Sequence, residues 1–94
     1  MTKVDYITAS GPYAEIHIGE GAWAIRERMQ HLEERLDPRR FFRIHRSVIV
    51  RLDAVEALLT RPGGDYSVRM KDGTELSVSR ARRDELSERL GVGG

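Results

Sequence analysis

Arginine side chains gather in two short stretches of this sequence, and their spacing points to the binding of an anion. Residues 39–51 carry five arginines and residues 79–83 carry three, with no acidic residue in either stretch. A guanidinium group presents a planar set of donors that can bond two acceptors on guanine or clamp a phosphate. The two stretches are therefore the candidates for contact with a polyanion.

The rest of the chain is acidic, although the 94 residues together carry a formal net charge of only +1. Setting the eight clustered arginines aside leaves eight basic residues against fifteen acidic ones, a net charge of −7. Charge divided in this way indicates one positive face on an acidic body. Such a face attracts a polyanion locally without making the whole surface adhesive.

The first stretch also contains apolar residues that must be buried. They are Phe42, Ile44, Val48, Ile49, Val50 and Leu52. Because such residues favour a buried sheet surface, we expect the core to fix this segment, with Arg46 at a strand end or in a short loop. Ser47 could donate to a phosphate, and His45 could donate or fix the loop. Composition leaves a second interpretation open, in which Arg43 and Arg46 are solvated residues paired with carboxylates.

The second stretch begins with Ser79, which precedes Arg80, Arg82 and Arg83. If a helix starts near Ser79, a suitable capping residue, its first amide groups point outward and suit a phosphate. Positive charge at a helix start is mildly unfavourable by itself. An anionic partner would explain the arginines, and the other interpretation is a basic surface patch.

Hydrophobic periodicity and turn signals predict the remaining elements. Strands are expected at 4–8, 13–18, 55–60, 66–70 and 75–78, with the central segment as a further strand. Residues 22–26 fit either a strand or the start of a helix, and we favour a strand. A stripe formed by Ile25, Met29, Leu32 and Leu36 predicts a helix from Glu27 to about Asp37, just ahead of Pro38. Leu86 and Leu90 predict a short C-terminal helix.

These elements predict a mostly β fold: a compact antiparallel β domain with one central short helix and a C-terminal helix. The length indicates a single domain over residues 1–94, with a core at 4–90 and a flexible tail at 91–94. The chain has no cysteine, which excludes disulfides and thiolate metal sites. No apolar run is long enough to span a bilayer, and we expect a cytoplasmic protein.

Three groups of residues together match one family pattern. They are Phe42–Ser47 with Ile49, Val50 and Leu52; Gly73 with Val78, Ser79 and Arg80; and Tyr6 and Ile7 with Tyr13. In these positions the chain resembles the LytTR-type DNA-binding domain, the output domain of many bacterial transcription regulators. The resemblance covers residues 4–90 and implies a compact, mostly β fold.

The resemblance implies sequence-specific double-stranded DNA binding for transcription regulation, with loops bearing Arg46 and Arg80 inserted into grooves. The DNA-binding residues that it implies are Tyr13, Arg43, His45, Arg46, Ser47, Arg51, Ser79, Arg80, Arg82 and Arg83. Similar domains bind paired direct repeats as two copies and follow a receiver or sensor domain. We therefore expect a homodimer on DNA and a regulatory domain in the full-length protein.

Two positions depart from the family pattern, and a third is ambiguous. Arg51 stands where the family usually has asparagine, and Ala81 stands where it usually has a basic residue. The second departure leaves open which of the neighbouring arginines contacts bases. Tyr13 could bond or stack on DNA, but an aromatic residue at a strand start is as often part of the core.

Enzyme chemistry has little support in this sequence. His45, Ser47 and Asp53 lack the nucleophile elbow that would make a triad credible, so we predict no enzyme. His17, His31 and His45 lack metal-ligand spacing, and no cofactor is expected. The remaining alternative is a protein-interaction or anionic-ligand-sensing β module whose arginines capture an acidic protein or a small anion.

Overall fold

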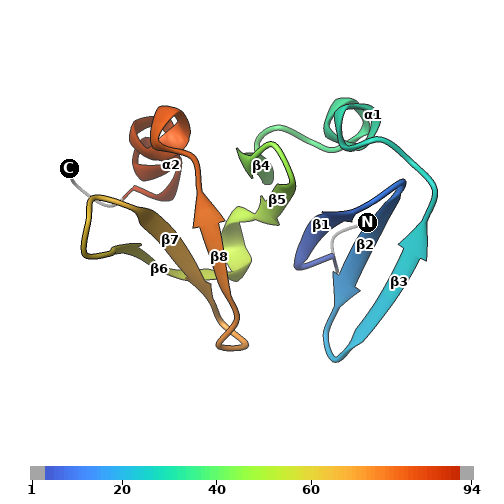
Figure 1. Ribbon diagram of the computed structural model, residues 1–94, viewed down its shortest axis with the longest axis horizontal. Helices are drawn as coiled ribbons and strands as arrows, with labels where there is room; N and C mark the ends of the chain where they lie inside the picture. Colours follow the sequence, from blue (N-terminus) through green and yellow to red (C-terminus); the bar gives the residue numbers. More distant parts are fainter. Residues whose placement is uncertain (1–3, 92–94) are drawn as a thin grey trace.

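A computed structural model of the protein describes residues 4–91 (Figure 1). Within this range, the strands are β1 (Tyr6–Ser10), β2 (Tyr13–Ile18), β3 (Gly21–Ile25), β4 (Phe41–His45), β5 (Val48–Arg51), β6 (Val55–Thr60), β7 (Tyr66–Met70) and β8 (Glu75–Val78). The helices are α1 (Met29–Arg35) and α2 (Arg83–Leu90), with short 3₁₀ turns η1 (Leu52–Ala54) and η2 (Arg80–Arg82). The expected mostly β, antiparallel architecture with two helices is confirmed.

The strands form two antiparallel sheets. The first has five strands in the order β3-β2-β1-β5-β4, and the second has three in the order β6-β7-β8. Figure 1 shows the second sheet on the left, β1 to β3 on the right, and the β4–β5 hairpin between them. The chain therefore places its central arginine-rich segment in the middle of the molecule.

The β4–β5 hairpin is buried on both faces. Phe42, Ile44, Val48 and Val50 belong to a core that faces the second sheet. Phe41 and Ile49 belong to a separate core under α1. Because successive side chains of a strand point to opposite faces, one short hairpin supplies both cores.

The two helices cover opposite sides of this hairpin. Met29, Leu32 and Leu36 of the α1 region pack into the core that contains Ile49. Leu86 and Leu90 of α2 pack against the core that contains Phe42. Figure 1 shows the two helices on either side of β4. The expectation that the first helix covers one side of the sheet is confirmed.

Three boundaries differ from the sequence prediction. The central segment forms two strands joined by a turn at Arg46 and Ser47, where a single strand was predicted. The first helix begins at Met29, because Ile25 pairs with Ala14 as the last residue of β3. The first strand spans Tyr6–Ser10, where residues 4–8 were predicted.

The predicted helix start at Ser79 was also wrong in detail. Ser79 precedes the 3₁₀ turn η2, where its side chain makes no capping hydrogen bond, and α2 begins only at Arg83. The first turn of α2 carries Asp84 and Glu85, which its dipole favours. Most of the predicted tail, residues 92–94, lies outside the described residues. Among the described residues, the helices lack the length and apolar character required to span a bilayer.

Replacement of Leu86 tests the packing between α2 and the hairpin. Leu86 is fully buried, whereas Leu59 is half-buried and lies outside both cores. We expect Leu86→Ala to lower the free energy of unfolding by about 2–5 kcal/mol, because it leaves a cavity at the centre of the core. Urea denaturation measures the change. Leu59→Ala is the matched control and should cost clearly less; equal losses would contradict the packing described.

Candidate nucleic-acid interface

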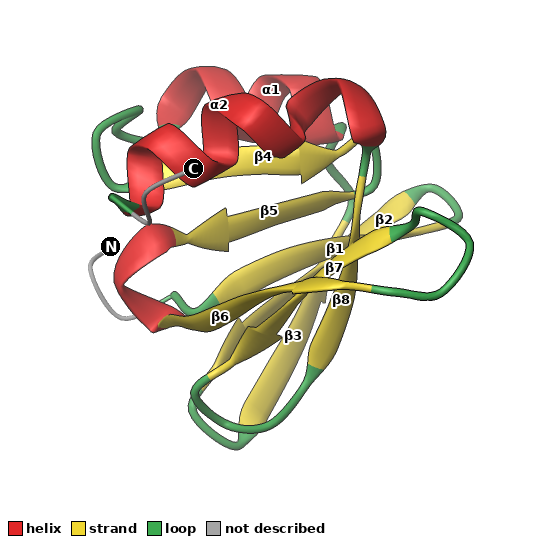
Figure 2. Cartoon of the chain, turned by 90° about the vertical axis from the view of Figure 1, so that its left-hand side faces the viewer, coloured by secondary structure: helices red, strands yellow, loops and turns green. Residues whose placement is uncertain are grey.

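Backbone hydrogen bonds bring three separate loops to one end of the molecule. The amide of Ala9 donates to the carbonyl of Ser47 at 2.8 Å, which joins the β1–β2 turn to the β4–β5 turn. The amide of Ser79 donates to the carbonyl of Ile44 at 2.7 Å, which joins the end of β8 to the same hairpin. Figure 2 shows the β1–β2 and β6–β7 loops at the right-hand end, toward which β4 also points.

Arg46 lies in the β4–β5 turn with its side chain exposed. Within residues 4–91 its guanidinium makes no hydrogen bond or ion pair. The backbone beneath it is held, because Arg43 Nη2 donates to the carbonyl of Arg46 while Arg43 Nη1 pairs with Glu33 Oε1 of α1 at 3.1 Å. The prediction that Arg46 lies at a strand end or in a short loop is confirmed, and its side chain has no partner within the described residues.

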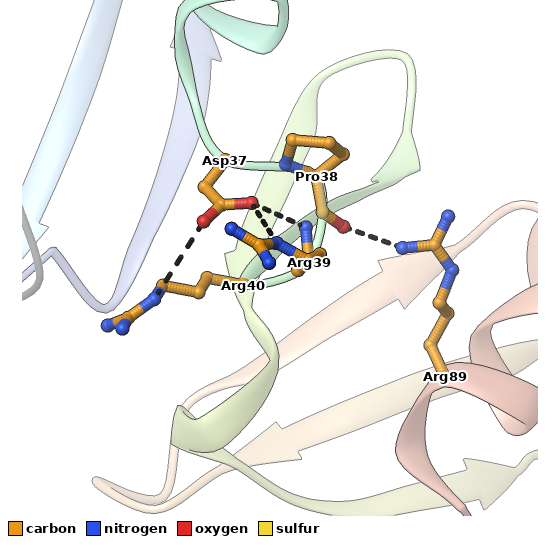
Figure 3. A network of polar contacts seen from close by, with 5 residues as sticks. All are labelled: Asp37, Pro38, Arg39, Arg40 and Arg89. Carbon is orange, nitrogen blue, oxygen red and sulfur yellow. Dashed lines mark hydrogen bonds and ion pairs between the residues drawn. The ribbon is translucent and has the colours of Figure 1, made fainter.

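The other four arginines of the first stretch are paired with carboxylates. Arg43 pairs with Glu33, and Arg51 Nη2 lies 3.0 Å from Asp5 Oδ1. Figure 3 shows Arg39 and Arg40 against Asp37, with nitrogen–oxygen distances of 3.4 and 4.0 Å. The backbone hydrogen bond from Arg39, followed by the nearby guanidinium groups, lowers the pKa of Asp37. Its carboxylate therefore stays charged and offsets these two arginines at neutral pH.

Hydrogen bonds between His45 and Ser47 stabilise the turn around Arg46. His45 Nδ1 lies 2.8 Å from Ser47 Oγ and accepts from the Ser47 amide at 3.2 Å. The register shift between Arg43 and His45 is a bulge, which pairs His45 with Val48. Bulges redirect side chains near functional sites. The His45 ring therefore holds the turn through its Nδ1 atom.

Arg80 is the exposed arginine of the second stretch, with 68% of its side chain accessible. Its Nη2 lies 3.3 Å from Asp65 Oδ1 and 3.4 Å from the carbonyl of Gly63, both in the β6–β7 loop. A groove of about 670 Å³ lies beside it, lined mainly by the second sheet and the β6–β7 loop, with Asp65, Ser77 and Ser79 among the lining residues, and by His45 of β4. Arg80 and His45 therefore share one concave surface.

Arg82 and Arg83 lie toward α2 and stack on aromatic rings. The guanidinium carbon of Arg82 is 6.0 Å from the centre of the Phe42 ring, and that of Arg83 is 5.3 Å from the Tyr66 ring. Arg83 also bonds Asp84 at 3.1 Å. Both side chains are half-buried, so of this cluster Arg80 is the one most open to a partner.

The two remaining predicted residues, Tyr13 and Arg51, lie at opposite ends of the first sheet. Tyr13 faces Ser10 across the first hairpin turn, where Gly11 adopts a φ of +57°, and it is 45% exposed. It therefore lies on the surface near Arg46, outside the core. Arg51 lies at the opposite end of β5, where its Nε also donates to the carbonyl of Val4. The structure does not bring Arg51 together with Arg46.

Sequence reasoning missed three residues near this end of the molecule. Asp65, in the β6–β7 loop, holds Arg80. Arg26 and Arg28 follow β3 and line a shallow depression together with Pro12 of the first turn. They are isolated in sequence among Glu27 and other mixed charges, and only the strand order places them here. No cluster of three or more potential metal ligands occurs in the part of the chain that the structure describes.

Comparison with known proteins identifies the family. The model of the LytTr DNA-binding domain matches residues 1–91. The chain belongs to the LytTR DNA-binding domain family. This family binds DNA in transcription regulation and is not a family of enzymes.

Two relatives share this domain within longer proteins. The CO-responsive transcriptional regulator RcoM of Rhodospirillum rubrum is 41% identical over 90 residues, which cover 95% of this chain and 38% of that protein. An uncharacterized response regulatory protein of Vibrio cholerae is 31% identical over 85 residues, covering 86% of this chain and 32% of that protein. This LytTR domain thus spans well under half of each relative.

A solved structure has the same fold. It is the LytTr DNA-binding domain of a Bacillus cereus protein assigned as a methyl-accepting/DNA response regulator, with a TM-score of 0.85 and 24% sequence identity. The similarity covers 96% of this chain and 83% of the other. The LytTR fold therefore extends over nearly all of the present chain.

The ion pair of Arg51 with Asp5 predicts a structural role for this arginine. Both side chains are about one quarter exposed, and Arg51 bonds Asp5 and the Val4 carbonyl. We expect Arg51→Ala to lower the free energy of unfolding by about 1–3 kcal/mol, because a charged hydrogen-bonded partner is left unpaired. Urea denaturation measures this loss, and fluorescence anisotropy should show unchanged DNA affinity. A loss of affinity comparable to that of Arg46→Ala would place Arg51 in the interface instead.

Proposed function

We propose that this LytTR domain reads a specific sequence of double-stranded DNA through loops that carry Arg46 and Arg80. The observation that carries the proposal is the contrast within the first arginine stretch. Four of its five arginines are paired with carboxylates of the same chain, and only Arg46 is exposed without such a partner in the described residues. An unpaired guanidinium on a fixed turn is suited to a DNA base edge.

The turn around Arg46 supports base reading more than simple phosphate attraction. Its backbone is held by His45, by Arg43 and by the amide of Ala9. A held turn costs little ordering free energy on binding, and a guanidinium can bond O6 and N7 of guanine together in the major groove. Arg46 is therefore assigned the principal base contact.

Arg80 is assigned a second groove contact. Its ion pair with Asp65 is exposed on both sides, with 68% and 73% of the side chains accessible. Exposed pairs contribute only about 0.2–1 kcal/mol, so DNA can displace Asp65 from one edge of the guanidinium. Asp65 would then orient Arg80 in the free protein without preventing its use.

Neighbouring polar groups are assigned the positioning of the duplex. Ser47, Ser79 and Tyr13 lie at the same end of the molecule as Arg46. Hydroxyl groups commonly bond phosphates, which sets register and orientation while base contacts set sequence. The stacked arginines of the α2 side, Arg82 and Arg83, would add charge around this surface.

The proposal extends to assembly on DNA. One domain offers few base contacts, so binding by a single copy should be weak. We propose that two copies bind paired direct repeats and that a regulatory receiver or sensor domain controls the pair in the full-length protein. The named relatives, a CO-responsive regulator and a response regulatory protein, fit this arrangement.

Selection from a random duplex library tests the function directly. The purified 94-residue chain is used to enrich duplexes, and anisotropy then compares the enriched site with a scrambled control. Enrichment of a short motif, repeated about one helical turn apart, supports the proposal. If neither the single domain nor an artificially dimerised form enriches any motif while both are folded, an anion-binding or protein-interaction role replaces it.

Replacement of Arg46 is the sharpest test of the reading residue. We expect Arg46→Ala to cost about 1–3 kcal/mol on the selected site and to relax the preference at one position, because the bidentate contact is lost. The matched control is Arg39→Ala at the other end of β4, which removes the same charge from an 89% exposed side chain. Anisotropy on single-base variants of the site measures both. Unchanged preference in the Arg46 variant would rule out this assignment.

A further inference from the structure

Two further arginines lie at the same end of the first sheet as the proposed reading surface. Their side chains make no hydrogen bond or ion pair within residues 4–91. Arg26 and Arg28 are both exposed. They belong to the segment between β3 and α1, and they line a shallow depression together with Pro12 of the β1–β2 turn and with His31. That turn is joined to the Arg46 turn through the Ala9 amide. The depression therefore lies at the same end of the first sheet as the proposed interface.

The acidic residue between these arginines does not neutralise them. The Oε1 atom of Glu27 accepts from His31 Nδ1 at 2.9 Å, and its Oε2 lies 3.9 Å from Arg35. The hydrogen bond from His31 lowers the pKa of Glu27, so the carboxylate is charged and already committed to the helix. The Glu27 carboxylate therefore forms no ion pair with the guanidinium group of Arg26 or of Arg28.

The strand order fixes how far these arginines lie from the reading turn. β3 is the outer strand of the first sheet, three positions from β5 and four from β4. Its last residue, Ile25, pairs with Ala14 at the same end of the sheet as the first turn. Adjacent strands lie about 4.8 Å apart, which places the segment about 14–19 Å from the Arg46 turn.

That separation matches a neighbouring part of the DNA backbone. Base pairs rise about 3.4 Å each, so 14–19 Å corresponds to about four to six base pairs. With the first sheet laid along the duplex, an arginine at this distance would lie beyond a major groove about 12 Å wide, over the phosphates that border the next groove. Phosphate is also a ligand suited to two exposed guanidinium groups that make no hydrogen bond or ion pair within residues 4–91.

We infer that Arg26 and Arg28 form a second, phosphate-binding site on the backbone flanking the bases read by Arg46. The inference rests on the proposed function. The site supplies affinity without sequence information, and it extends the contact surface from the Arg46 turn toward the outer strand β3 of the first sheet. Binding to phosphates alone makes its contribution dependent on salt.

The first test compares two double variants of equal charge. Arg26→Ala with Arg28→Ala should weaken binding to all duplexes alike and reduce the salt slope by about two, which is a loss of tenfold to a hundredfold near 0.1 M salt. Arg39→Ala with Arg40→Ala is the control, because it removes the same two charges at the far end of β4, where Asp37 already offsets them. Anisotropy across a salt series on the selected duplex measures both.

The second test locates the contact on the DNA. Neutral methylphosphonate linkages replace phosphates four to six base pairs from the position that Arg46 reads. In a double-mutant cycle, these linkages should weaken the wild-type protein but have little effect on the Arg26/Arg28 variant. Linkages placed on the other side of the site should weaken both proteins equally.

The outcomes separate this inference from the proposed function. Wild-type protein that shows no sequence preference, even when dimerised, refutes the proposed function. The second site alone is refuted if the wild-type protein selects a site but the two double variants lose equal affinity for it. It is likewise refuted if the Arg26/Arg28 substitutions show no coupling to the methylphosphonate linkages. Circular dichroism of both variants confirms that neither loss reflects unfolding.

Discussion

The burial of the β4–β5 hairpin on both faces is the constraint on which the structure depends. Phe42 and Val50 enter one core and Phe41 and Ile49 the other, so neither sheet can shift without moving the hairpin. Buried backbone groups also require partners, and the neighbouring segments supply them through the amides of Ala9 and Ser79. The turn at Arg46 is therefore fixed by the same interactions that stabilise the fold, and the flanking loops are aligned with it.

Internal ion pairs decide which arginines remain available to DNA. Asp5, Glu33 and Asp37 occupy the guanidinium groups that surround Arg46 in the sequence. Arg26, Arg28 and Arg46 are thereby left as exposed arginines without an ion pair, within residues 4–91, at one end of the first sheet. Because counterion release gives every exposed cation a non-specific affinity for DNA, pairing the other arginines would, under the proposed function, limit binding through other faces. The acidic residues would then contribute to specificity without contacting DNA.

The local pattern predicted some elements closely because their environment is local. β6, β7 and β8 fall on the predicted residues, since alternating side chains and the Asp72–Gly73 turn define them. The central segment was predicted as one strand because both of its faces are buried, which removes the alternation that reveals a turn. Ile25 lies at helical spacing from Met29, but pairing with Ala14 overrides that signal.

The site was harder to predict than the fold, because availability depends on partners remote in sequence. In the sequence, Arg43 and Arg46 look alike, because both are arginines of the same basic stretch. In the structure, Arg43 pairs with Glu33, ten residues away, whereas no acidic residue pairs with Arg46 in the described chain. The two arginines therefore have different roles. Arg43 fixes the backbone by donating to the carbonyl of Arg46, and this leaves the Arg46 side chain unrestrained. A fixed backbone under a free side chain aims the Arg46 guanidinium while leaving it able to adapt to a partner, so the placement of Arg46 depends on the ion pair of Arg43 with Glu33 of α1.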